Sequence, residues 1–121
     1  MKFQLGLVLL LVATTPAGGS ESLSLQVSPR NSFAPANLQV LVRMATDAGN
    51  RSLTIVADSE EFYRSSEIPL EGERAPRSVL VAFRGMPGGE YHVSATLFDS
   101  QGDRRGRVQQ QVLVLSSASV R

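Results

Sequence analysis

The chain lacks cysteine and tryptophan and contains a single histidine, His92. Without cysteine it can form no disulfide, thiolate nucleophile, zinc–thiolate site or iron–sulfur cluster, and no lipid-modified cysteine. A lone histidine with no candidate nucleophile or further ligand beside it is a poor basis for catalysis or for metal binding. The residue inventory therefore predicts a protein that is not an enzyme and has no catalytic residues, no metal site and no cofactor.

Lysine is almost absent as well. Lys2 is the only one, and the remaining basic residues of the 12 are arginines, set against 11 acidic residues. Removal of an N-terminal segment that contains Lys2 would leave 11 arginines and a formal charge near zero. Nucleic-acid binding usually needs a net basic surface, so this balance argues against a nucleic-acid partner.

The first residues have the pattern of an export signal. Met1-Lys2 is a short basic start, and residues 5–13 form an apolar run that is shorter than the about 20 residues that span a bilayer. Small residues and Pro16 follow, as signal peptidase requires. We expect cleavage after Ala17, with Gly19 as the second choice; the alternative is an uncleaved N-terminal anchor. No other segment is apolar enough to span a membrane, which predicts a periplasmic or secreted protein.

Seven strand-like runs follow, separated by turn residues, and no helix is indicated. Their apolar residues alternate with polar ones, which is typical of half-buried strands. The runs cover residues 23–27, 37–44, 52–57, 61–68, 77–84, 90–99 and 106–115. Strands that recur every 10 to 15 residues leave no room for crossover helices. The expected organisation is a signal peptide over 1–17, one antiparallel all-β domain over 18–115 and a flexible tail over 116–121.

The run over 61–68 is rich in charge and is bounded by Pro69. Charged residues and a nearby proline are how edge strands avoid pairing with other chains. We therefore expect this run to be an edge strand.

Two overlapping motifs carry a family resemblance. Pro87-Gly88-Gly89-Glu90-Tyr91-x-Val93 resembles the corner before strand F of immunoglobulin-like domains, where a tyrosine hydroxyl bonds to upstream backbone. Residues 83–91 are also similar to the connection between strands E and F of fibronectin-type-III-like modules. The resemblance implies a seven-stranded antiparallel β-sandwich with Tyr91 as its structural tyrosine corner. The missing cysteines and tryptophan leave a fibronectin-like module, a bacterial immunoglobulin-like module and a transthyretin-like variant open.

Three polar clusters could carry chemistry, but each also has a plainer explanation. Residues 99–103 hold two carboxylates and no closing glutamate, which fits a hairpin turn better than a calcium loop. The carboxylates over 58–61 could hydrolyse glycosides only within a concave cleft. The arginines over 104–107 could bind an anion, or they could lie exposed in solvent. We expect all three to be ordinary surface.

Aromatic residues suggest a binding surface instead. If Tyr91 and Val93 face the core, alternation places Phe98 outward, and by the same logic Val56 faces outward from its strand. Phe62 and Tyr63 are adjacent, so one of them faces outward. These residues would form an exposed apolar patch on one sheet, and contiguous patches of this kind mark contacts with partners.

The sequence therefore predicts an exported binding module whose partner is another protein or a component of the cell envelope. The alternative is a carbohydrate-binding module, which would need Tyr63 and Phe98 exposed and coplanar on one face. Only two tyrosines and no tryptophan count against it.

Overall fold

Alternating hydrophobic residues organise the chain into eight strands within residues 23–116, which are the residues that the computed structural model describes. The strands are β1 (Leu23–Ser28), β2 (Asn31–Phe33), β3 (Ala36–Met44), β4 (Ser52–Asp58), β5 (Tyr63–Pro69), β6 (Ser78–Met86), β7 (Gly89–Phe98) and β8 (Arg104–Leu115). One short 3-10 helix, η2 (Gly72–Arg74), lies between β5 and β6. The prediction of an all-β domain is confirmed, whereas the predicted number of seven strands is wrong.

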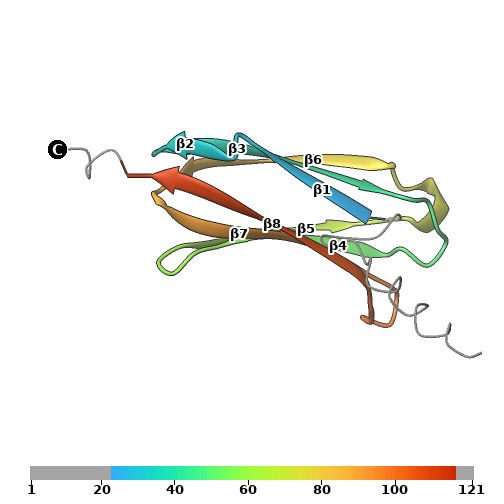
Figure 1. Ribbon diagram of the computed structural model, residues 1–121. Helices are drawn as coiled ribbons and strands as arrows, with labels where there is room; N and C mark the ends of the chain where they lie inside the picture. Colours follow the sequence, from blue (N-terminus) through green and yellow to red (C-terminus); the bar gives the residue numbers. More distant parts are fainter. Residues whose placement is uncertain (1–22, 117–121) are drawn as a thin grey trace, which may run out of the picture.

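The strands form two sheets that pack face to face (Figure 1). The smaller sheet has the order β1-β3-β6, and the larger has the order β2-β8-β7-β4-β5. All pairs are antiparallel except β2 with β8, which is parallel. The strand over 63–69 lies at the end of the larger sheet, so the predicted edge strand is confirmed.

Strand β2 is the strand that the sequence analysis missed. It has only three residues and lies between Pro29 and Pro35, which read locally as strand-ending signals. Its parallel register sets Phe33 beside Leu115, and the Ala34 N–H donates to the Leu115 carbonyl at 2.7 Å. After β1 the chain thus crosses to the edge of the other sheet for three residues before it returns as β3.

The core lies between the two sheets and consists mostly of side chains that alternation points inward. In β3 the residues at every second position are buried, and Leu38, Val40 and Val42 have no exposed surface. The facing strands contribute Leu53 and Ile55, which are also fully buried. Continuous burial of this kind stabilises a domain that has no disulfide.

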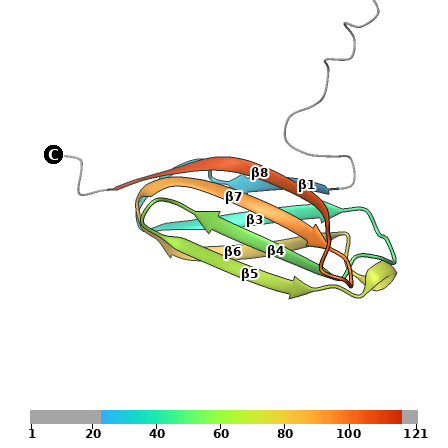
Figure 2. The ribbon, with the colours of Figure 1, turned by 90° about the horizontal axis from the view of Figure 1, so that it is seen from below.

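The two sides of the sandwich are closed differently (Figure 2). On one side β1 lies against β8, and the Gln110 side chain bonds both the N–H and the carbonyl of Val27 at 3.4 Å. On the other side lie the two edge strands β5 and β6. A side-chain bond bridges them there, from the Arg64 guanidinium to the Arg84 carbonyl at 2.6 Å.

Gly72 occupies a backbone conformation that favours glycine. Its φ is +61°, and an added Cβ would lie 3.0 Å from the Ala48 carbonyl oxygen. We expect Gly72→Ala to destabilise the domain by more than the about 1–2 kcal/mol of left-handed strain alone. Gly102→Ala is the matched control, because its φ is +82° but nothing lies within 4 Å of the added Cβ. Chemical denaturation of both variants checks this, and equal losses would contradict the close contact.

The expected signal peptide over 1–17, with its cleavage site, and residues 117–121 of the expected tail lie outside the described residues. Within residues 23–116, no helix is long and apolar enough to cross a membrane.

Candidate interaction surface

Tyr63 is the most exposed aromatic residue of the predicted surface, with 62% of its surface accessible. It opens the edge strand β5, opposite Asp58 of β4, and Asp58 in turn pairs with His92 of β7. Because directly opposite residues share a face of the sheet, the three side chains lie in one row on the outer face. This row ends at the free edge of the larger sheet.

Phe62, its neighbour, points the other way and packs against the core. Its ring meets the Tyr91 ring edge-on, with 6.4 Å between ring centroids and an angle of 84°. The Arg64 guanidinium lies over the Phe62 ring, 5.2 Å from its centroid. The structure thus distinguishes the two residues: Tyr63 faces solvent, and Phe62 packs against the core.

Tyr91 is buried, with only 1% of its surface exposed, and its hydroxyl donates to the Pro87 carbonyl at 2.6 Å. This bond to upstream backbone is the one expected from the motif at residues 87–93. Burial raises the pKa of Tyr91 above its usual 10.0, although a hydrogen bond with Ser59 and the charge of Arg64 act in the opposite direction.

Val56 and Phe98 lie on the same outer face as Tyr63, but both are only half-exposed. In the register of the larger sheet, Tyr63 pairs with Asp58 and Phe98 pairs with Ser52, six residues further along β4. At 3.3 Å per residue this separates the two rows by about 20 Å. Polar residues occupy the rows between them, so the structure does not join the predicted residues into one apolar patch. The ring pair expected for a sugar platform is also not side by side. The intervening polar residues are Thr54, Ser65, Glu67, Ser94 and Thr96.

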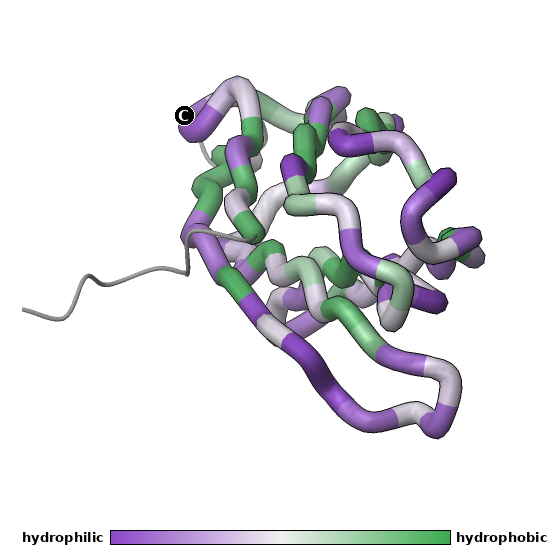
Figure 3. Tube along the Cα trace, turned by 90° about the vertical axis from the view of Figure 1, so that its right-hand side faces the viewer, coloured by the Kyte–Doolittle hydropathy of each residue, from purple (hydrophilic) through white to green (hydrophobic). Residues whose placement is uncertain are grey.

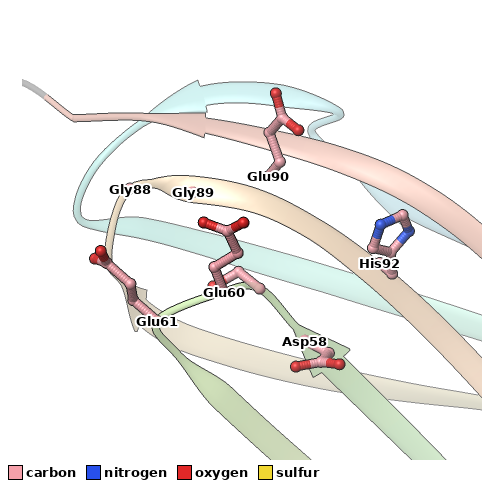
Figure 4. Close-up of a pocket in the computed structure, with 8 residues that line it drawn as sticks. Asp58, Glu60, Glu61, Gly88, Gly89, Glu90 and His92 are labelled. Carbon is pink, nitrogen blue, oxygen red and sulfur yellow. The ribbon is translucent and has the colours of Figure 1, made fainter.

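An acidic cleft of about 710 Å³ adjoins the Tyr63 row (Figure 4). It is lined by Asp58, Glu60, Glu61, Glu90 and His92, together with Ser59, Gly88 and Gly89. Figure 4 shows the carboxylates spread around the cleft and pointing in different directions. Within the described residues, no three His, Cys, Asp or Glu side chains are grouped so as to hold a metal ion. His92 is exposed and bonds Gln109 on the outer face at 3.0 Å.

Within residues 99–103, the Asp99 carboxylate stabilises a turn. One Asp99 oxygen accepts the N–H groups of Gln101 and Asp103, each at 2.9 Å. The Asp99 N–H donates to the Asp103 carbonyl at 2.9 Å, which closes the hairpin between β7 and β8. These bonds are those of a hairpin turn, as the sequence analysis expects.

The arginines over 104–107 lie along that hairpin, which projects from the domain and is largely hydrophilic (Figure 3). Arg105 forms an ion pair with Asp47 at 3.1 Å, and Arg107 donates to Gln109 at 3.0 Å. Two of the three arginines therefore have partners within the domain.

Exposed apolar residues also occur where the sequence analysis placed no site. Leu80 of β6 is 61% exposed, and so is Phe33 of β2, with Leu115 beside it at 41%. Alternation in the run over 77–84 already places Leu80 opposite to Val79 and Val81. The missing information was the pairing order, which puts β6 at the end of its sheet.

No protein-family model matches the chain, and no curated protein matches it significantly. Among solved structures, superoxide reductase (neelaredoxin) from Ignicoccus hospitalis is similar, with a TM-score of 0.61 and 11% identity. That match covers 79% of this chain and 82% of the reductase. A family 76 glycoside hydrolase from a bovine Bacteroides thetaiotaomicron strain matches with a TM-score of 0.55 and 14% identity, over 83% of this chain and 21% of the hydrolase. At these identities the likeness concerns the fold alone.

Proposed function

We propose that this protein is an exported, non-enzymatic interaction module that binds another protein or a component of the cell envelope through the outer face of its larger sheet. The contact centres on Tyr63 and includes the edge strand β5. The observation that carries the proposal is the exposure of Tyr63, 62% accessible in a row that ends at a free sheet edge. Exposed tyrosines are frequent anchors of interfaces because they bury a large ring and keep a polar group at its rim.

The domain type that we propose is immunoglobulin-like or fibronectin-type-III-like. Support comes from the motif at residues 83–93, the Tyr91 hydroxyl bond to Pro87, and sheets of order β1-β3-β6 and β8-β7-β4-β5 once the short β2 is set aside. Such modules host recognition and spacing functions without shared chemistry, so the partner follows from the surface and not from the fold. Export rests on the signal-like pattern over 1–17.

Capture from the producing cell's envelope extract tests this function. We expect the mature wild-type protein to retain a defined envelope component, identified by mass spectrometry, that Tyr63→Ser loses. Phe33→Ser is the matched control, because it removes an equally exposed aromatic ring from the other end of the same sheet. Equal capture by Tyr63→Ser and wild type would contradict the proposal. Binding on a glycan array that Tyr63→Ser abolishes, with no envelope component captured by the wild type, would favour the carbohydrate-binding alternative.

A further inference from the structure

Strand β6 ends the smaller sheet and pairs only with β3 among the described residues. The Met44 N–H donates to the Arg77 carbonyl at 2.8 Å, so the backbone groups of Arg77 point toward β3. In an antiparallel pair the backbone groups of every second residue point to the same neighbouring strand. The N–H and C=O groups of Val79, Val81 and Phe83 therefore also point toward β3. The N–H and C=O groups of Ser78, Leu80 and Ala82 therefore point away from the sheet. The Arg84 carbonyl, next in this series, does so as well and accepts the Arg64 bond.

The two edges on this side of the sandwich differ in protection. Beside β5, the Leu70 N–H donates to the Arg51 carbonyl, so the backbone groups of Leu70 point toward β4. By alternation, the backbone groups that point to the free edge of β5 are those of Tyr63, Ser65, Glu67 and Pro69. A proline and a charge at an edge discourage pairing with other strands. Residues 78–83 of β6 contain neither, and the exposed Leu80 lies at their centre. Of the two edges, β6 is the one that is competent to accept another strand.

The charged residues within the three strands of the smaller sheet are all basic. Strands β1, β3 and β6 contain no aspartate or glutamate, and their charged residues are Arg43 and Arg84. Arg43 and Arg77 line a depression beside Ser78, and Arg84 lines another beside Ala82. The free segment of β6 is therefore apolar in the middle and basic at both ends.

We propose that β6 is a second binding site, which accepts an extended peptide segment as an added antiparallel strand. The segment has an apolar residue opposite Leu80 and a carboxylate near each end, opposite Arg84 and Arg77. Backbone pairing provides affinity in this mode, and side chains at alternate positions provide specificity. A second copy of the chain is a poor occupant, because self-pairing of β6 would gather the arginines of both copies with no carboxylate from either sheet. The site lies on the other sheet from Tyr63 and is independent of the proposed function.

The probe is the synthetic peptide acetyl-Glu-Thr-Val-Thr-Leu-Thr-Ser-Glu-amide, titrated into the folded domain. Its matched control carries arginine in place of both glutamates. We expect saturable binding of the acidic peptide, and slowed amide hydrogen exchange at Ser78, Leu80 and Ala82 by nuclear magnetic resonance. Absence of binding, or protection in β5 instead, would overturn the proposal.

Edge prolines locate the site on the protein. Ala82→Pro removes an N–H that faces solvent, so the fold should tolerate it, and we expect peptide binding to weaken by about tenfold or more. Ser65→Pro makes the same change on the β5 edge and should leave binding unaltered. Thermal denaturation checks that both variants are folded. Weakened binding in Ser65→Pro with normal binding in Ala82→Pro would show that the peptide pairs with β5 and would overturn the proposal.

Charge reversal tests the chemistry of the occupant. The Arg77→Glu, Arg84→Glu double variant should bind the acidic peptide about tenfold more weakly and the arginine-ended control more tightly. Unchanged preference would overturn the acidic-peptide assignment. Sedimentation of the wild type without peptide tests whether β6 pairs with a second copy of the chain. Dimers that Ala82→Pro abolishes would show such pairing and would overturn the proposal.

Discussion

Val40→Asp is expected to lower the free energy of unfolding by about 3–5 kcal/mol. Val40 has no exposed surface and lies in the middle of the central strand β3, between β1 and β6. A carboxylate there has no basic partner in β1, β3 or β6 facing the core, and an uncompensated buried charge costs about 3–5 kcal/mol. That is a large part of the about 5–15 kcal/mol by which domains are stable.

Gln39→Asp is the matched control for this change. Gln39 is the preceding residue of the same strand and points to solvent. A surface substitution of this kind changes stability by about 0.5 kcal/mol or less. Circular dichroism and urea denaturation of the two variants measure the difference. If both were equally harmful, or if Gln39→Asp were the worse, the register of β3 would be wrong, because a slip of one residue exchanges its two faces.

Tyr91 is expected to give the second largest effect. Tyr91→Ala removes a ring that is 99% buried and contacts Phe62, for which core truncations indicate about 3–5 kcal/mol. Tyr91→Phe keeps the ring and removes only the hydroxyl bond to the Pro87 carbonyl, which should cost roughly 1–3 kcal/mol. Tyr63→Phe, at the exposed position, should leave the denaturation midpoint unchanged. An unchanged midpoint in Tyr91→Phe would contradict a stabilising role for the hydroxyl bond.

The raised pKa of Tyr91 gives this prediction a pH dependence. Burial favours the neutral phenol in the folded state, whereas the unfolded chain ionises near the usual pKa of 10.0. The stability that this difference supplies is complete below pH 10.0 and declines as the pH rises through the folded pKa. Wild type should therefore lose stability in alkaline solution more steeply than Tyr91→Phe. Parallel slopes in urea denaturation across that range would contradict the burial of the phenol.

Local pattern was sufficient to place most of the fold and part of the surface. Alternation in the runs 37–44 and 52–57 located β3 and β4, and charge with Pro69 identified β5 as an edge. It could not locate β2, whose three residues are held by pairing with Leu113–Leu115 at the other end of the chain. Adjacent positions alone also could not decide which of Phe62 and Tyr63 faces outward.

The β6 edge shows a different limit of local reasoning. Residues 77–84 have a strong strand pattern, but whether such a strand is central or terminal depends on which strands flank it, and that is a property of the whole topology. The outward patch failed for a similar reason. Alternation placed Val56, Tyr63 and Phe98 on one face, whereas the distance between Tyr63 and Phe98 follows from the register of β5 and β7 on β4.

The contact between β1 and β8 limits the order in which the strands can come together during folding. The Gln110 side chain bonds Val27 across 83 residues of sequence, and within residues 23–116 β2 pairs only with the last residues of β8. Chains dominated by such distant contacts fold slowly, on timescales of about milliseconds to seconds. The pairing of β2 and the bonds between Val27 and Gln110 can therefore form only after β8 has been synthesised, whereas β1 can already pair with β3.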